Sequence, residues 1–545
     1  MQTIQMVLLL LFIITVSGFV ARLPGIRVVP LPLIQIALGA GFSHFTGIEV
    51  ELEPDIFFLL FIPPLLFLDG RRIPKGAFFH DLRPILTLAV GLVIFTVLGV
   101  GFLIDWLIPS IPVAVAFALA AILSPTDPVA VSAITAKSPL APRLMHILEG
   151  ESLLNDASGL VCFRFAVAAA LTGSFSLAHA SLSFVLVALG GVAVGAAVTA
   201  SVSFLNQVLV RLMGEDRSIR ILMDMLIPFG AYLAAERLHV SGILAAAAAG
   251  IAMHYADLAG RPSAATRMQR GTVWDTVQMV LNGTMFVLLG EQLPRLLRGA
   301  EATAHEAGLD SPWVLGAYIV LLGVALTVLR LLWVWASLKL TIFPARQRSG
   351  EAHRRSFHRT LLISAVAGVR GTITLAGILT LPLTLSDGTP FPARDLAIFL
   401  AMGVILLSLV SASVALPLLA SKFDFAPAVP LADEEIDARS ALGEAAIRSM
   451  EQIASEAPSH VSEVRAQAAS HLVDQYRRRL DYAHIPRDEL QYVRELEQAQ
   501  SELRTTALKA ERDELYRLRI SGQIDGTLHD KLLREIDMVE SSLCK

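Results

Sequence analysis

Long apolar runs separated by short polar stretches fill residues 1–420, and the pattern changes abruptly after them. A helix needs about 20 apolar residues to cross a bilayer, and thirteen runs approach that length. We therefore expect an all-α membrane protein with about thirteen transmembrane helices, over residues 4–22, 28–45, 55–69, 84–104, 112–134, 143–171, 182–210, 219–235, 240–255, 276–293, 313–338, 359–382 and 395–420.

Basic residues gather in alternate loops between these runs. If the N-terminus lies outside, the inner loops hold twenty Lys and Arg residues, Arg220, Arg267 and Arg270 among them, and the outer loops hold four. Cytoplasmic loops are enriched in Lys and Arg. The pattern predicts a multi-pass protein in the lipid of the cell (inner) membrane, with its N-terminus outside and its C-terminal tail in the cytoplasm.

Residues 421–545 have the composition of a soluble protein, with 24 acidic and 17 basic residues. The whole chain is only 17% charged and 54% hydrophobic, whereas soluble domains carry about 25% charged residues. We expect a transmembrane domain over 1–420 and a helical cytoplasmic tail over 421–545, and neither part suggests nucleic-acid binding or a cofactor. The stretch 488–519 is either a solvated helix with many ion pairs or part of a regulatory unit.

The fifth run is interrupted by two prolines on either side of Thr126 and Asp127. Proline removes a backbone donor and clashes with the preceding turn, so this helix should break near mid-membrane. Free carbonyl groups, the Thr126 hydroxyl and the Asp127 carboxylate could then bind a cation. Alternatively, Asp127 only caps a kinked structural helix.

The sixth run carries Glu151, Ser152, Asn155 and Asp156 within one helical turn. Ser152 and Asp156 are i,i+4 neighbours, and so are Glu151 and Asn155. Oxygen ligands of this kind suit hard cations, although a purely structural polar network would use the same residues. Ionisable residues within a membrane are expensive and usually functional.

Two arginines interrupt later apolar runs. Arg330 has no acidic residue within its own run, and Glu151 is its natural partner. A buried pair of this kind is more plausibly a specificity device than a source of stability. Arg370 lies between Gly368 and Gly371, which suggests a second broken helix.

The two predicted breaks occupy equivalent places in the chain. If the seventh run is a linker, helices 1–6 and 8–13 can form two inverted repeats, with the broken fifth and twelfth helices in matching positions. Paired interrupted helices are a good sequence indicator of a transporter's midplane site. Asp69 follows a proline pair near the end of the third run, where it could line an entry funnel or cap a loop.

Residues 150–156, 127–131 and 368–371 together resemble motifs of the monovalent cation/proton antiporters, which include bacterial sodium/proton antiporters and animal sodium/proton exchangers. The resemblance covers residues 1–420. It implies exchange of sodium, potassium or lithium for protons, a homodimer, and a six-helix core that moves like an elevator against a dimerisation scaffold.

The resemblance also implies roles for single residues. Asp156 would contact the cation, Asp127, Thr126 and Ser152 would lie nearby, and Glu151 would pair with Arg330. Many family members place an acid closer to the proline pair than Asp69, which leaves its role open.

Three functions fit the pattern to different degrees. Sodium/proton antiport fits best, and Asn155 favours electroneutral exchange because it leaves only one acid, Asp156, on that helical turn to carry a proton. A channel or sensor on the same scaffold is a second reading. An intramembrane serine protease using Ser152 would need a nearby histidine, and the candidates His146, His239 and His254 lie near predicted helix ends.

Overall fold

The computed structural model describes residues 2–26, 29–46, 54–73, 75–135, 142–172, 177–260, 263–306, 311–337, 361–385, 388–421, 431–455, 462–483, 487–521 and 523–543. The predicted basic loop at 339–359 lies outside these residues. The regular secondary structure of the described residues is helical, apart from an isolated bridge between Thr384 and Pro390. It divides into two compact units, Met1–Ala426 and Pro427–Lys545.

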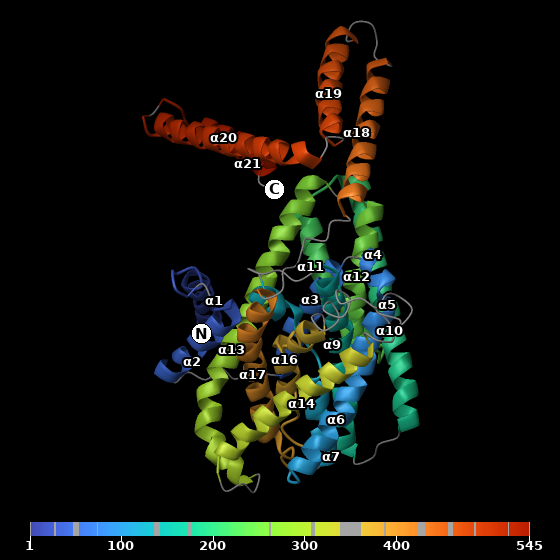
Figure 1. Cartoon of the computed structure of the whole chain (residues 1–545), viewed down its shortest axis with the longest axis vertical. Helices are drawn as coiled ribbons and strands as arrows, with labels where there is room; N and C mark the ends of the chain where they lie inside the picture. The colour runs from blue at the N-terminus through green and yellow to red at the C-terminus, as the bar shows by residue number, and fades with distance from the viewer. Residues whose placement is uncertain are drawn as a thin grey trace. The chain divides into compact units, whose positions relative to one another are not determined.

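Seventeen helices of the first unit are described (Figure 1). They are α1 (Gln2–Val20), α2 (Leu31–Thr46), α3 (Pro54–Arg72), α4 (Lys75–His80), α5 (Leu82–Leu86), the π-helix η1 (Thr87–Gly91), α6 (Leu92–Leu107), α7 (Val113–Leu123), α8 (Pro128–Thr135), α9 (Pro142–Thr172), α10 (Leu177–Met213), α11 (Arg217–Arg237), α12 (Gly242–Gly260), α13 (Ala264–Glu306), α14 (Trp313–Ser337), α16 (Thr372–Leu379) and α17 (Arg394–Ser421).

These helices form two bundles. One, here called the scaffold bundle, contains α1–α3 and α10–α13, in which α2 packs on α13 and α12 packs on α3, α10 and α11. The other, the core bundle, contains η1, α6–α9, α14, α16 and α17. The two bundles meet where α3 packs on α9 and α16, and α13 packs on α16 and α17.

Glycines allow the scaffold helices to approach at backbone distance. A Cβ atom added to Gly39 of α2 would lie 2.1 Å from the Val287 carbonyl oxygen of α13. One added to Gly290 of α13 would lie 2.0 Å from the Ile36 carbonyl oxygen. Gly70 and Gly250 make the same reciprocal contact between α3 and α12. Small residues are what membrane helices need to pack this closely, so the scaffold bundle is tightly interlocked.

The helices agree in part with the thirteen predicted spans. Seven described helices are long and apolar enough to cross a membrane, and two further apolar helices, Gln5–Val20 and Val113–Leu123, are shorter. The chain is therefore a multi-pass membrane protein, while the count of thirteen stays a prediction.

The predicted tenth span lies within a much longer helix. The sequence suggested 276–293, whereas α13 covers 43 residues, Ala264–Glu306. Arg267 and Arg270, assigned to a loop, lie within this helix, and Arg220 lies within α11. Polar residues lower the hydropathy of 264–275, but the Arg270 guanidinium is buried against Asp224 and Asp257. A charged residue at the end of an apolar run can therefore continue a helix when other helices supply its partners.

Two helices break where the sequence predicted. The fifth run becomes α7 and α8, separated by residues 124–127, and the twelfth becomes a helical turn at 361–366 and α16, separated by 367–371. Pro128 opens α8, a position where its missing N–H costs nothing. The Ala130 amide donates to Asp127 Oδ1 at 3.1 Å, so Asp127 does cap the second half-helix.

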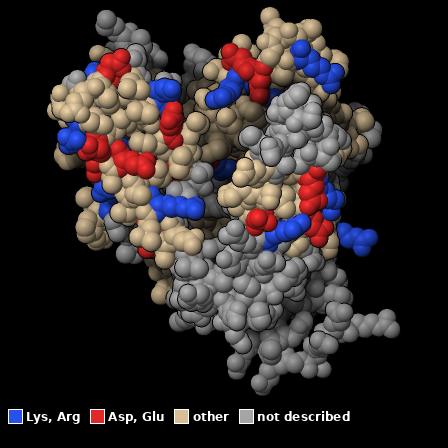
Figure 2. Space-filling view, turned by 90° about the horizontal axis from the view of Figure 1, so that it is seen from above, with Lys and Arg blue, Asp and Glu red and all other residues tan. Residues whose placement is uncertain are grey.

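The second unit consists of α18 (Leu431–Ser455), α19 (Ser462–Ala483), α20 (Arg487–Ile520) and α21 (Gly526–Leu543). The predicted helix at 488–519 is α20. Arg512 of α20 donates to Asp537 at 2.8 Å and to Glu540, both on α21, and these carboxylates raise the pKa of the guanidinium. Figure 2 shows acidic and basic side chains interspersed on the face of the molecule that it draws.

Candidate functional site

The two breaks lie directly against each other. The Asp127 amide donates to the Val369 carbonyl oxygen at 2.7 Å, which joins the first break to the second. A Cβ atom added to Gly371 would lie 1.8 Å from Asp127 Oδ2. Only glycine fits this crossing, since any side chain at residue 371 would displace the carboxylate.

Helix α9 runs beside the first break and bonds to it through Ser152 and Asn155. Ser152 Oγ donates to the Thr126 carbonyl oxygen at 2.7 Å, and Asn155 Nδ2 donates to Thr126 Oγ1 at 3.0 Å. Ser152 Oγ is also 3.5 Å from Asp156 Oδ2. A hydroxyl has one hydrogen to donate. Since Thr126 takes it, Ser152 Oγ can accept a hydrogen bond from a protonated Asp156 or bind a cation.

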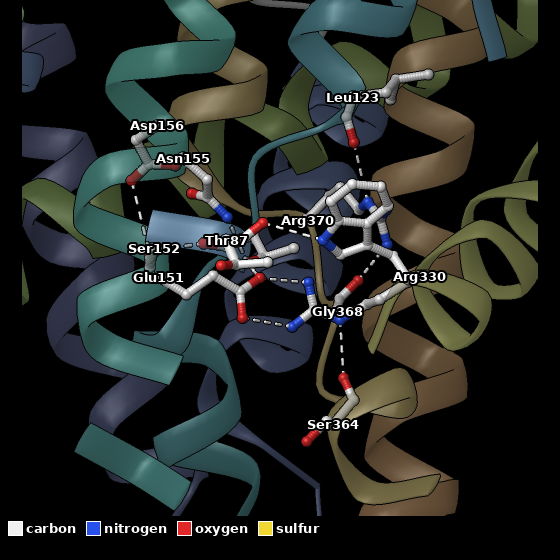
Figure 3. A network of polar contacts seen from close by, with 12 residues as sticks. Thr87, Leu123, Glu151, Ser152, Asn155, Asp156, Arg330, Ser364, Gly368 and Arg370 are labelled. Atoms are coloured by element: carbon white, nitrogen blue, oxygen red, sulfur yellow. Dashed lines mark hydrogen bonds and ion pairs between the residues drawn. The ribbon is translucent and has the colours of Figure 1, made fainter. Parts of the chain in front are cut away.

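Glu151 and Arg330 form a buried ion pair, visible in Figure 3. Both guanidinium Nη atoms donate to the carboxylate, Nη2 to Oε2 at 2.9 Å. Arg330 Nε donates to the Ser364 carbonyl oxygen at 2.7 Å, before the second break. The side chains are 1% and 2% exposed. A Cβ atom added to Gly368 would lie 2.7 Å from Arg330 Cδ, so this glycine makes room for the arginine.

Arg370 bonds to carbonyl groups that the breaks leave free. Its Nε donates to the Leu123 carbonyl oxygen at 3.0 Å, and its Nη1 donates to that of Gly368. Its backbone amide donates to Ser408 Oγ of α17 at 3.0 Å. Leu123 ends α7, and the C-terminal end of a helix carries a partial negative charge. The Arg370 charge therefore stabilises the broken ends of both helices (Figure 3).

A small cavity of about 20 Å³ opens at this crossing. That volume holds about one water molecule or one dehydrated ion. Residues of both bundles line this cavity. They are Leu65, Asp69, Pro125, Thr126, Asp127, Pro128, Ser152, Asp156, Gln278, Asn282, Gly371, Thr372, Ile373 and Thr374.

The structure thus brings together most of the residues singled out in the sequence. Asp127, Thr126, Ser152 and Asp156 line one cavity, and Asp69 joins them from the scaffold bundle. Asn155 does not line it and holds Thr126 in place instead. Gln278 and Asn282 of α13 were missed, although two amides one helical turn apart within a predicted span were a visible signal.

The acids in this region differ in their partners. Glu151 is paired with Arg330, whereas no described basic side chain pairs with Asp156, which is only 3% exposed. A buried carboxylate without a basic partner favours either a proton or a bound cation, because both remove the cost of its charge. Asp69, Asp127 and Asp156 line the same cavity, and their mutual repulsion strengthens this preference.

A second contact joins the bundles elsewhere. Arg164 of α9 donates to Glu236 of α11 at 3.0 Å and to the Tyr232 hydroxyl at 3.3 Å. These residues line a larger cavity of about 510 Å³ between α9 and α11.

Comparisons with known proteins agree on one family. The family model described as sodium/hydrogen exchanger, transmembrane, matches residues 7–422. The chain is 38% identical to an uncharacterised Na+/H+ exchanger of Escherichia coli, over 100% of this chain and 99% of that protein. It is 39% identical to a sodium, potassium, lithium and rubidium/H+ antiporter of Bacillus pumilus, over 96% and 76%. The structure of a sodium proton antiporter from Methanocaldococcus jannaschii covers 77% of this chain with a TM-score of 0.56 and 18% identity, which shows a shared fold.

Proposed function

This chain belongs to the sodium/hydrogen exchanger family, whose members are membrane transporters and not enzymes, and we propose that it exchanges sodium for protons in pH homeostasis. Sodium is the preferred cation, with potassium and lithium as the alternatives. The names of similar antiporters support this range, because they include sodium, potassium, lithium and rubidium. The observation that carries the proposal is the unpaired Asp156 carboxylate on a cavity with room for one ion.

Cation and proton compete for Asp156. Ser152 Oγ and the oxygens of Thr126 and Asp127 complete a set of hard ligands around the same cavity, as sodium prefers. A bound cation lowers the proton affinity of the carboxylate, and a bound proton removes its charge. Each ligand therefore expels the other, which is the physical basis of exchange.

The exchange is electroneutral, with one cation moved for each proton. Asn155 has no proton to release, and both carboxylate oxygens of Glu151 are engaged by Arg330. Asp127 caps α8, and the positive N-terminal end of a helix favours a charged carboxylate. Asp156 is then the acid that carries the transported proton, and Asp69 lines the same cavity from the scaffold bundle.

The core bundle moves like an elevator against a scaffold bundle that forms a homodimer. The two bundles contain two inverted repeats, with the N-terminus outside and the tail inside. The interlocked glycine contacts of the scaffold bundle support a rigid frame. Cross-linking of the purified protein should trap dimers through the scaffold, and a protein that stays monomeric in lipid would contradict this.

The second unit regulates transport and is not needed for it. All residues of the cavity belong to the first unit. A chain truncated before Asp433 should insert and exchange ions with an altered pH response. Complete loss of exchange in a truncated protein that inserts normally would contradict this role.

Proteoliposomes with a clamped membrane potential test the proposal. An imposed sodium gradient should drive proton movement in the opposite direction, and voltage alone should drive none. A membrane voltage contributes about 2.3 kcal/mol per charge per 100 mV, so an electrogenic exchanger would respond plainly. Proton flux that needs no cation gradient would indicate a channel instead.

A further inference from the structure

Two amides of the scaffold bundle face the carboxylates of the core bundle. Gln278 and Asn282 lie one turn apart on α13, and both line the cavity that holds Asp127 and Asp156. Gln278 is 7% exposed and Asn282 is half-buried. Neither belongs to a broken helix, and neither contributes to the chemistry of exchange described above.

Gln278 has a fixed orientation. Its Oε1 accepts a hydrogen bond from Arg72 Nη1, and Arg72 Nη2 also pairs with Asp275 at 2.6 Å. Because a guanidinium only donates hydrogen bonds, the amide oxygen of Gln278 must face Arg72. Its remaining NH₂ group suits a carboxylate better than a cation.

Asn282 differs from Gln278 in this respect. Its side chain makes no hydrogen bond to any residue in the described part of the chain, although it lines a cavity with three carboxylates. An amide can present either its oxygen or its NH₂ group. Asn282 can therefore offer oxygen to a cation when the site is loaded, and NH₂ to a carboxylate when it is not.

The helix that carries Asn282 is fixed to the scaffold bundle. Gly290, two turns further along α13, and Gly39 of α2 hold the two backbones in direct contact. Asp156, Asp127 and Thr126 belong to the core bundle. If the core bundle moves against the scaffold bundle, as proposed above, Asn282 stays behind and meets the cation in only one of the two end states.

We infer that Asn282 is a scaffold-side cation ligand that acts at one face of the membrane only. It lowers the apparent KM for sodium at the one face that is served when α13 lies against the site, as it does here, and has no contact with the ion at the other face. This inference rests on the proposed function, since it needs an exchanging protein whose core bundle moves relative to its scaffold bundle.

The test compares both faces of vesicles of known orientation. Asn282→Leu removes the amide and keeps the number and branching of the side-chain heavy atoms. Gln269→Leu removes an amide at an exposed position of the same helix outside the cavity. The apparent KM for sodium is measured by adding the cation on one face and then on the other. For Asn282→Leu we expect an increase of about five- to tenfold at one face, as the loss of one polar contact implies, and less than twofold at the other.

The controls separate the possible failures. Gln269→Leu should match the wild type at both faces, and Asn282→Ser, which keeps an oxygen, should recover part of the affinity. Should the Leu variant fail to insert, Asn282→Ser replaces it, with a smaller increase expected at the same single face. An unchanged KM, or an equal increase at both faces, overturns the inference while leaving exchange intact. A wild-type protein that does not exchange sodium for protons overturns the proposed function itself.

Discussion

Each bundle buries an arginine against acids, but the number of acids that the arginine contacts differs. In the core bundle, Arg330 meets one acid, Glu151, and all its guanidinium nitrogens are bonded. In the scaffold bundle, Arg270 meets two acids, Asp224 at 3.0 Å and Asp257 at 2.5 Å, and its Nε has no partner among the described residues. Both arrangements hold helices together, α9 to α14 in one and α11 to α12 and α13 in the other.

Comparing buried acids that have an arginine partner with one that has none shows which carboxylate can work in transport. Glu151 has its own arginine, and Asp224 and Asp257 share Arg270, so each of these acids has a basic partner. Asp156 lies one helical turn from Glu151 but has no basic partner in the described chain, and it lines a cavity. A buried acid alone thus does not indicate an ion site. An ion site is indicated by a buried acid that lacks a basic partner and also lines a cavity.

The largest expected effect follows from removing that unpaired charge. Asp156→Asn keeps the volume and removes the titratable group, so sodium-driven proton flux should fall to the level of empty vesicles. Asp224→Asn, the same change at a paired acid of the scaffold bundle, should retain exchange for every correctly inserted molecule. Wild-type flux in Asp156→Asn would contradict the claim that the acid without a basic partner is the one that works in transport.

Breaking the core pair should cost stability. Glu151→Ala leaves Arg330 buried without its acid, which destabilises by about 3–5 kcal/mol. Thermal melting in detergent should show this loss, and the double variant Glu151→Leu with Arg330→Met should recover much of it. A double variant as unstable as Glu151→Ala would mean that the pair does not carry the stability of this region.

Breaking the scaffold cluster should cost less. Arg270→Met leaves two acids unpaired, but the Asp257 side chain is 22% exposed and can stay hydrated. We expect a loss toward the lower end of about 3–5 kcal/mol, with an unchanged KM for sodium. A KM that rises severalfold in Arg270→Met would show that the scaffold cluster takes part in ion binding.

The two regions were not equally predictable from the sequence. Around Asp127 and Arg370 the sequence predicts the helix breaks directly, because two prolines and two glycines interrupt apolar runs. Few other local structures fit this pattern. Glu151 and Arg330 could be matched because each lacks any other partner nearby. The Arg270 cluster gave no such signal, since loop arginines and helix arginines look alike until the partners from α11 and α12 are known.

Asp69 and Asn282 mark the limit of sequence analysis for the site. Both reach the cavity from the scaffold bundle, and only the packing of α3 and α13 against the core bundle brings them there. Spacing within one helix can predict which side chains share a face. It does not predict which face of another bundle they meet.

The smallest effect concerns a buried base that pairs with no acid among the described residues. Lys75, in α4 between the spans, donates to the carbonyl oxygens of Gly70 and Ile73, each at 2.7 Å. Burial, with a smaller contribution from Arg71, lowers its pKa from 10.5 to about 8. Between about pH 8 and 10.5 the unfolded chain therefore binds more protons than the folded one, and stability rises with pH.

A pH series of melting curves checks this sign. From pH 8 to 10, wild type should gain stability relative to Lys75→Met by on the order of 1 kcal/mol per pH unit. A difference that stays constant, or that falls as the pH rises, would show that the base keeps its ordinary pKa in the folded protein.

Proton release on cation binding tests the central claim most directly. Sodium is added to the purified protein in weakly buffered detergent solution, and the released protons are counted against the bound cations. The account predicts about one proton released per sodium ion by the wild type, because both compete for Asp156, and none by Asp156→Asn. Sodium binding to the wild type without proton release would contradict the account.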